Sequence, residues 1–274
     1  MYYISSKKNN LYGITDSKDD IEEFYDTKFI FDNFKDINIK GVYRNGSNFR
    51  INVWNPVKEA LKYKMACSDF EIEIDKNCVT LRSYMGTDSD LVIPDFITNL
   101  YEECFFDCTD LKSIVIPDLV KTLSASCFSG CVNLKSVKMP NSLTTINSYA
   151  FHSCEHLDNV IIPNSVNKLG SYCFFDCINL KRLVIPNSVE SIGSNCFNCC
   201  VSLESMVIPN SVNKLGSYCF FDCTNLKRVV IPDSVDYIGE GCFDYCSSIE
   251  IIECNNNQAE NLNKYSDKLK IRGL

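Results

Sequence analysis

Hydrophobic residues recur every 23 positions through most of the chain. One column is aliphatic, a second is phenylalanine, and seven prolines keep the same spacing. The three columns are Leu111, Leu134, Leu157, Leu180, Leu203, Leu226 and Ile249; Phe105, Phe128, Phe151, Phe174, Phe197, Phe220 and Phe243; and Pro94, Pro117, Pro140, Pro163, Pro186, Pro209 and Pro232. A fixed period of this length is typical of a solenoid, in which one unit stacks along an axis. The pattern predicts a repeat solenoid of seven 23-residue β-rich coils over residues 91–251.

Each unit begins with a short strand. In the second unit Ile114 and Ile116 point inward with the period of two that strands show, and Pro117 ends the strand because proline has no N–H for a ladder. Later in the fifth unit, Gly193 marks a bend where backbone passes without a side chain. The arc that follows, residues 194–200, is expected to be a helical turn or a 3₁₀ segment.

The 17 cysteines follow the same repeat. The first column is Cys104, Cys127, Cys173, Cys196, Cys219 and Cys242, and the second is Cys108, Cys131, Cys154, Cys177, Cys200, Cys223 and Cys246. Ala150 fills the first column in the third unit, so this position accepts a small apolar group. Because free cysteine behaves as a small hydrophobe, the placement predicts two inward ladders of reduced thiols. Stacked disulfides are the alternative, since neighbouring coils lie about 4.8 Å apart, within disulfide range.

The two ends of the solenoid differ from its middle. Residues 67–90 alternate polar and apolar side chains and predict a β-hairpin that caps the first coil. Residues 252–274 are polar and predict a C-terminal cap. Terminal caps of this kind shield the apolar ends of repeat proteins.

Residues 1–66 do not repeat and predict a small α+β module. A hairpin is expected from residues 37–44 and 49–54, turned by Asn45 and Gly46. Helices are expected over residues 17–35 and from Asn55 to about Met65, the second with Pro56 at its first position.

The repeat resembles a known family. The motif Leu-x-x-Ile-x-Ile-Pro, then Ser-Val-x-x-Ile-Gly and Cys-Phe-x-x-Cys, is similar to the BspA-like leucine-rich repeat proteins over residues 69–251. The run from Gly86 to Pro94 resembles the join between their N-terminal cap and first repeat. The resemblance implies a leucine-rich-repeat horseshoe with a binding role, often as a surface-associated adhesin or host-interaction protein. Residues 1–66 resemble no family in this way.

The chain departs from the leucine-rich pattern at two positions. Cysteine stands where the family usually has alanine before the phenylalanine. Serine replaces the ladder asparagine at Ser142, Ser165, Ser188, Ser211 and Ser234.

Charge and hydropathy exclude some partners. The net charge is −8, with 11 basic and 9 acidic residues in 1–68 (+2), which leaves −10 for the remainder. An acidic solenoid binds nucleic acid poorly, because phosphate contacts depend on lysine and arginine. No apolar run approaches the roughly 18 residues of a membrane helix, so no membrane insertion is expected. The N-terminus has no apolar segment of a secretory signal, which favours a cytoplasmic protein; a cell-surface location, implied by the resemblance, is the alternative.

Two groups of residues contain side chains that could carry chemistry. His152, Cys154 and His156, with cysteines of the neighbouring coils, include the residue types of a zinc site, but Cys154 belongs to the inward ladder. Cys196 and Cys199 have redox-motif spacing without the βαβ context of such motifs. We therefore predict a protein that is not an enzyme and needs no cofactor. A metal-binding or enzymatic N-terminal module is the distant alternative.

A line of outward strand residues is the predicted binding surface. Its members are Val92, Val115, Lys138, Ile161, Val184, Val207 and Val230, beside a polar column of Ser113, Ser136, Asn159, Arg182, Ser205 and Arg228. β-Branched residues suit any strand, so a passive strand face is the alternative. An apolar stripe with polar edges is nevertheless typical of an interaction surface, and the concave face of a solenoid is where such surfaces lie. Arg182 and Arg228 are expected to orient a carboxylate of a protein partner.

Overall fold

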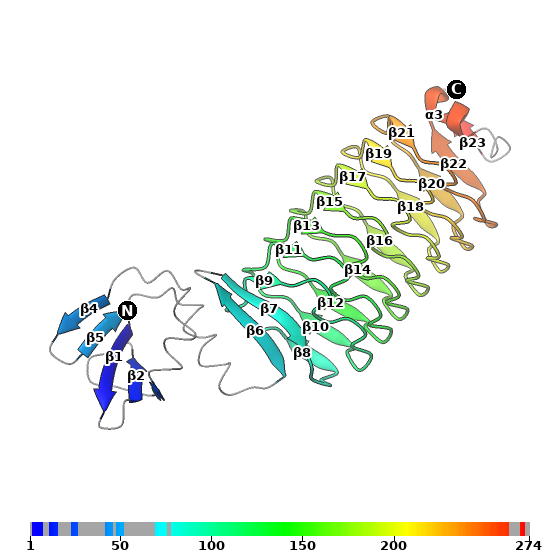
Figure 1. Cartoon of the computed structure of the whole chain (residues 1–274). Helices are drawn as coiled ribbons and strands as arrows, with labels where there is room; N and C mark the ends of the chain where they lie inside the picture. The colour runs from blue at the N-terminus through cyan, green and yellow to red at the C-terminus, as the bar shows by residue number, and fades with distance from the viewer. Residues whose placement is uncertain are drawn as a thin grey trace.

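The computed structural model describes residues 2–7, 11–15, 23–26, 42–45, 48–51, 69–75, 78–262 and 269–271. Seven coils stack along one axis, and β22 (Ile251–Cys254) begins an eighth turn (Figure 1). The first strands of the coils are β8 (Asp90–Val92), β10 (Ser113–Val115), β12 (Ser136–Lys138), β14 (Asn159–Ile161), β16 (Arg182–Val184), β18 (Ser205–Val207) and β20 (Arg228–Val230). The second strands are β9 (Asn99–Leu100), β11 (Thr122–Leu123), β13 (Thr145–Ile146), β15 (Lys168–Leu169), β17 (Ser191–Ile192), β19 (Lys214–Leu215) and β21 (Tyr237–Ile238). The predicted solenoid is confirmed.

Most strands pair in parallel with their equivalents in the neighbouring coils. Ser113 lies opposite Ser136, and Thr145 opposite Lys168, so the register equals the sequence period. The second strands form one continuous sheet from β11 to β21. Ladder bonds between the first strands are interrupted, giving the groups β8–β10–β12, β14–β16 and β18–β20–β22. Every residue therefore lies beside its own repeat equivalent, and each column of the sequence becomes a line along the axis.

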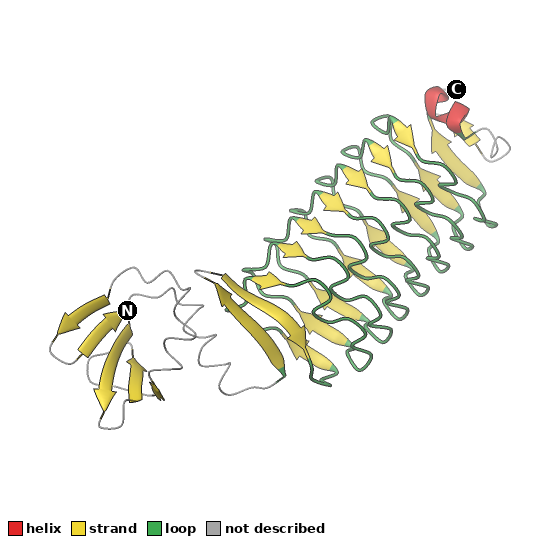
Figure 2. Ribbon diagram, in the orientation of Figure 1, coloured by secondary structure: helices red, strands yellow, loops and turns green. Residues whose placement is uncertain are grey.

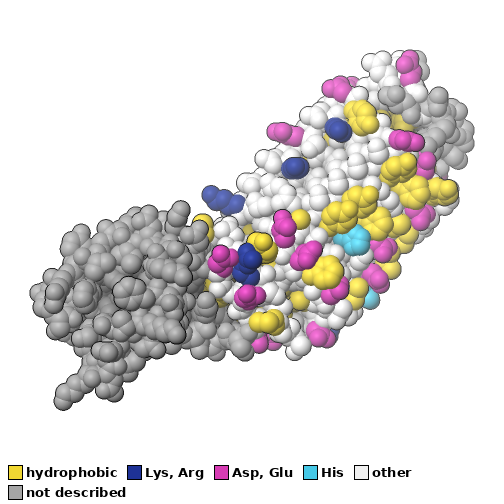
Figure 3. Space-filling view, in the orientation of Figure 1, with side chains coloured by type: hydrophobic (Ala, Val, Ile, Leu, Met, Phe, Trp, Pro, Cys, Tyr) yellow, Lys and Arg dark blue, Asp and Glu magenta, His cyan; other side chains and the backbone are white. Residues whose placement is uncertain are grey.

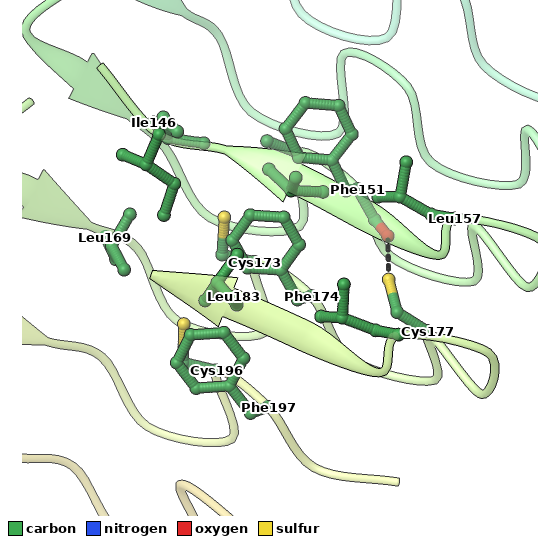
Figure 4. Packing of buried hydrophobic residues seen from close by; sticks show 14 of the residues in the cluster. Ile146, Phe151, Leu157, Leu169, Cys173, Phe174, Cys177, Leu183, Cys196 and Phe197 are labelled. Atoms are coloured by element: carbon green, nitrogen blue, oxygen red, sulfur yellow. Dashed lines mark hydrogen bonds between the residues drawn. The ribbon is translucent and has the colours of Figure 1, made fainter. Parts of the chain in front are cut away.

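The phenylalanine column forms the centre of the core. All seven rings are fully buried, and successive ring centroids lie between 5.1 and 5.6 Å apart. Figure 4 shows Phe151, Phe174 and Phe197 stacked in this way. A single coil cannot enclose its own ring, so stacking of coils is what creates the core.

Both cysteine columns point inward as predicted, with Cys108 and Cys246 half-buried. In the second column the thiol donates to the phenylalanine carbonyl of the preceding coil; Cys177 Sγ lies 3.2 Å from the Phe151 oxygen (Figure 4). The same bond recurs from Cys131 to Cys246 at 2.9–3.2 Å. All cysteines in the described part of the chain are free thiols.

The arc containing the cysteines is not the predicted helical turn or 3₁₀ segment. Asn195 and Cys199 have φ of 55° and 59°, and the equivalent residues of the other coils are also left-handed. The Asn198 N–H donates to Asn195 within the arc, whereas the Phe197 N–H donates to Cys219 in the next coil. A helix would keep both bonds within the coil. The competition from the neighbouring coil therefore decides the backbone conformation.

Glycine recurs at the position of Gly193 because neighbouring backbones approach closely there, as predicted. A Cβ on Gly193 would lie 2.4 Å from the Ser171 nitrogen and 2.6 Å from the Gly170 carbonyl carbon. Gly170, Gly216 and Gly239 face the backbone of their preceding coils in the same way. At these four coils glycine allows the close approach, whereas the second and third coils have Ser124 and Asn147 at this position.

Different elements cover the two ends. At the N-terminal end β6 (Phe70–Asp75) and β7 (Cys78–Tyr84) pair antiparallel where a hairpin is predicted, and β7 adds in parallel to β9. At the other end α3 (Asn256–Asn261, red in Figure 2) begins with a capping box between Asn255 and Gln258. The buried Gln258 amide donates to the carbonyls of Pro232 and Val235, which face no further coil. β23 (Leu269–Ile271) extends the sheet beside β22.

The described N-terminal residues form a five-stranded sheet in the order β3-β2-β1-β5-β4. Its strands are β1 (Tyr2–Lys7), β2 (Leu11–Thr15), β3 (Glu23–Asp26), β4 (Val42–Asn45) and β5 (Asn48–Ile51). β4 and β5 form the hairpin at Asn45, and residues 37–41 and 52–54 of the predicted strands lie outside the described residues.

The helix predicted over residues 17–35 is wrong at β3, which pairs antiparallel with β2. Phe24 and Tyr25 lie in β3, and aromatic residues favour strands once a partner strand is present. The helix predicted from Asn55 to Met65 lies outside the described residues.

Candidate functional site

The predicted binding residues form one line on the outer face of the first strands. Val92, Val115 and Lys138 are directly paired across β8, β10 and β12, as are Ile161 with Val184 and Val207 with Val230. We call this line, Val92 through Val230, the valine stripe. Lys138 interrupts it, so its longest apolar part is Ile161, Val184, Val207 and Val230.

The stripe is exposed because its neighbours in sequence face inward. Leu183 and Met206 are buried, while Ile161, Val184 and Val207 between such residues are 83%, 77% and 65% exposed. The strand period of two thus places an apolar residue in water at each of these coils.

The two arginines beside the stripe differ in what they contact. Arg228 pairs with Glu253 of the next coil, with 2.5 Å between Nη2 and Oε1. The Arg228 guanidinium is therefore already paired with a carboxylate of this chain. To orient a carboxylate of a partner, as expected from the sequence, it would have to leave Glu253. Arg182 is exposed and has no ion pair among the described residues.

The residues considered for zinc do not converge. Cys154 is buried and donates to the Phe128 carbonyl, His156 Nδ1 lies 2.8 Å from the Val132 carbonyl, and His152 stacks on Phe175 at 5.0 Å. His152 is half-buried, and burial lowers its pKa while Asp176 opposes that effect. No group of three or more metal-binding side chains is found within the described ranges.

The Cys196 and Cys199 pair is likewise split between core and surface. Cys196 is fully buried, and burial raises its pKa. Cys199 is half-buried and donates to Asn198 Oδ1 at 3.1 Å. Cys196 belongs to the ladder, whereas Cys199 stands where the fourth and sixth coils have Asp176 and Asp222, so the redox-motif spacing arises in this coil alone.

A pocket of about 210 Å³ lies where the hairpin cap meets the first coil. Its walls include Tyr84, Asp88, Phe106, Asp107 and Asp110. The Tyr84 hydroxyl donates to Asp88 at 2.8 Å, and burial is the main cause that raises the pKa of Tyr84 to about 12. The titratable side chains of its lining are thus the three carboxylates, the Tyr84 phenol and the Cys108 thiol.

A further surface, not predicted from the sequence, lies on the cysteine arc. Tyr149, His152, Tyr172 and Phe175 contact one another through their rings, and a second cluster holds Tyr218, Phe221 and Tyr245. Figure 3 shows hydrophobic and histidine side chains in a band bordered by acidic ones, with lysine and arginine lying outside it. The signal available in the sequence was the recurrence of Tyr, Phe and Asp at fixed arc positions in near-identical units.

Comparison with known proteins identifies the repeat. The family model described as "BspA type Leucine rich repeat region (6 copies)" matches residues 73–198 and 167–268. A crystal structure of a T. pallidum leucine-rich repeat protein is 27% identical with a TM-score of 0.64, covering 74% of this chain and 96% of that one. One from Bacteroides ovatus is 17% identical with a TM-score of 0.44, covering 68% and 70%. No curated protein matches. In the part of the chain that is described, no helix has the length and hydropathy to cross a membrane.

Proposed function

Because the chain belongs to the BspA-type leucine-rich repeat family, we propose that it is a non-enzymatic scaffold that recognises a protein partner through the valine stripe. The observation that carries this proposal is the exposure of Ile161, Val184 and Val207 on successive coils. A contiguous apolar line with polar edges favours a docking surface over a passive strand face. On this proposal the stripe lies on the concave side of the horseshoe.

The edges of the stripe supply the polar contacts that such a surface needs. Arg182 projects beside Val184 with a free guanidinium for a carboxylate of the partner. Arg228 is tied to Glu253, so it contributes orientation only if that ion pair exchanges. The apolar residues of the stripe would form the desolvated centre of the interface, and Arg182 would fix the position of the partner along the stripe.

A pair of substitutions tests this function. Val184→Lys with Val207→Lys places two charges on the stripe, and exposed changes of this kind cost about 0.5 kcal/mol of stability or less. The matched control is Asn167→Lys with Asn213→Lys, which adds the same charge at exposed positions outside the stripe.

All three proteins are used to capture binding proteins from a lysate of the native source, with the captured proteins identified and quantified. We expect a partner held by the wild type and by the control to fall at least tenfold with the stripe variant, which corresponds to about 1.4 kcal/mol. Equal capture by the two variants would move the binding site away from the stripe.

We also propose that the protein works in a reducing compartment, the cytoplasm. The support is the thiol ladders, in which each second-column cysteine from Cys131 to Cys246 is already engaged as a donor to a backbone carbonyl. Disulfides persist mainly in oxidising compartments, so reduced ladders fit a cytosolic setting.

A further inference from the structure

The cysteine arcs present a face with one sign of charge. Across the seven coils, the arcs at residues 100–110, 123–133, 146–156, 169–179, 192–202, 215–225 and 238–248 contain no lysine or arginine. The same arcs carry nine acidic residues: Glu102, Glu103, Asp107, Asp110, Glu155, Asp176, Asp222, Glu240 and Asp244. A surface of this composition attracts cations and repels anions.

Aromatic rings on this face are arranged as stacks along the axis. Tyr149 lies over Tyr172 with centroids 4.7 Å apart and planes 4° apart. His152 lies over Phe175 with centroids 5.0 Å apart and planes 6° apart. Each stack therefore places one ring per coil, at the spacing of the coils.

The stacks are interrupted at one coil. The positions after Tyr172 and Phe175 are Asn195 and Asn198, and the rings resume one coil later at Tyr218 and Phe221. Asn198 Nδ2 donates to Asn195 Oδ1 at 2.8 Å; Asn198 is only 7% exposed, and Asn195 is half-buried.

The rings beyond the interruption lean away from it. A Cβ on Gly241 would lie 2.4 Å from Tyr218 Cε1, so the Tyr218 ring covers the following coil. Phe221 contacts Tyr245 of that coil at 4.9 Å. Coils two apart are separated by about 10 Å, and a flat group between two rings needs about 7–8 Å. The interruption is thus one coil long, between Tyr172 and Tyr218.

Carboxylates stand at both sides of the same place. Asp176 and Asp222 precede and follow Cys199 in one column of the arc, and Cys199 Sγ lies 4.0 Å from Asp222 Oδ2. Burial and the nearby Glu155 raise the pKa of Asp176. A partly desolvated carboxylate in an acidic neighbourhood gains more from an incoming cation than a solvated one does.

We propose that the interruption, framed by Tyr172 and Asp176 on one side and by Tyr218 and Asp222 on the other, receives an arginine side chain of a protein partner. A guanidinium is flat, so it stacks on aromatic faces, and its fork of donors pairs with carboxylates. The lysine ammonium carries the positive charge but is not flat, and a neutral aromatic ring is flat but carries no charge. Each would therefore make only one of the two kinds of contact. The described part of the chain holds an example of this contact, since the Arg82 guanidinium lies 3.5 Å from the Tyr101 ring centroid.

The test measures binding of three synthetic peptides to the full chain by isothermal titration calorimetry. The probes are tetra-arginine, tetra-lysine of equal charge, and tetra-citrulline, which is flat and polar but neutral. We expect tetra-arginine to bind at least tenfold more tightly than tetra-lysine and tetra-citrulline to show no binding.

A triple variant fills the interruption without departing from the repeat. Asn195→Tyr, Asn198→Phe and Cys199→Asp give the fifth coil the residues of the fourth and sixth, so it is expected to fold, which circular dichroism and the unfolding midpoint check. It also adds a negative charge, so general attraction of cations would increase. We expect its affinity for tetra-arginine to fall at least tenfold. Asp176→Asn with Asp222→Asn is a second variant with the same expected loss, independent of the folding of the first.

The proposal is overturned by equal affinities for tetra-arginine and tetra-lysine, or by a folded triple variant that binds tetra-arginine as well as the wild type does. Binding of neutral oligosaccharides at this coil without an arginine preference would also overturn it. Val184→Lys with Val207→Lys is expected to leave tetra-arginine binding unchanged. The outcome is thus independent of the function proposed for the valine stripe.

Discussion

At the scale of single residues, the position of His152 in the repeat changes the pKa of its imidazole. Its imidazole stacks on Phe175 and is half-buried, so the folded state holds its pKa below the usual value of about 6.5. A lowered pKa means that protonation favours the unfolded chain. Stability is therefore unaffected above about pH 6.5 and declines as the pH falls from there toward the lowered pKa of the folded protein.

The variant His152→Phe should remove this contribution. Phenylalanine occupies the equivalent position in the fourth and sixth coils, so the stack is kept while the titration is lost. We expect the urea midpoint of the variant to fall less between pH 7.5 and 5.5 than that of the wild type. Carboxylates that do not interact with His152 are common to both proteins and cancel in the comparison, whereas Asp176 interacts with His152 and belongs to the measured contribution. Identical pH dependence in the two proteins would show that His152 titrates normally.

Gly193 is constrained by the distance between coils and not by its own φ. The substitution Gly193→Ala would push a methyl group against the backbone of Ser171 and Gly170, which cannot rotate away. We expect a loss of about 1–3 kcal/mol, as for overpacked sites, measured by denaturant unfolding. Asn147→Ala, in the same column, is the control, because that residue already carries a Cβ and should change stability little. An unchanged midpoint for Gly193→Ala would mean that the coils separate freely.

At the scale of elements, the phenylalanine ladder is the main link between coils. Phe174 is fully buried and stacks on Phe151 at 5.3 Å and on Phe197 at 5.5 Å. Phe174→Ala should cost about 3–5 kcal/mol, as for other buried phenylalanine truncations. Val184→Ala, at an exposed position, should cost less than about 0.5 kcal/mol under the same denaturation. Similar midpoints for both variants would contradict the ladder as a source of stability.

Most secondary-structure elements of the solenoid could be predicted from the sequence. Strands, inward columns and the reason for Gly193 followed from the period, because in a solenoid each residue meets its own equivalent. The left-handed residues Asn195 and Cys199 did not, since their conformation comes from hydrogen bonds to the next coil. The β3 strand was not predicted for a related reason. Its pairing with β2 is a contact between separate segments, and the spacing of aromatic residues within one segment does not reveal it.

The candidate site was predictable only in part. The outward phase of the valine stripe follows from alternation along each strand. The ion pair between Arg228 and Glu253 joins residues 25 positions apart, and no local sequence pattern predicts it. The arc clusters were missed because apolar residues in turns are not expected to stay exposed, yet left-handed positions such as Tyr149 and Tyr172 direct them outward.

At the scale of the whole molecule, the cysteine ladders connect the fold with its surroundings. The first-column thiols pack against one another, as Cys104 and Cys127 do with sulfurs 3.4 Å apart, and burial raises the pKa of ladder thiols such as Cys154 and Cys177. A neutral buried thiol reacts slowly, since the thiolate is the nucleophile. Among the cysteines that the structure describes, exposed Cys78 and half-buried Cys108, Cys199 and Cys246 should therefore react first in the folded protein.

Thiol titration of protein expressed in the cytosol tests this arrangement in two steps. Under native conditions we expect only the few accessible cysteines to react quickly. In denaturant without reductant, nearly all 17 should react, because the ladders hold free thiols. The comparison separates burial from oxidation: a cysteine hidden by packing appears on unfolding, whereas a disulfide stays silent until reductant is added. Fewer than about ten reactive thiols after unfolding would mean that neighbouring coils are cross-linked, and would favour an oxidising compartment over the proposed cytoplasm.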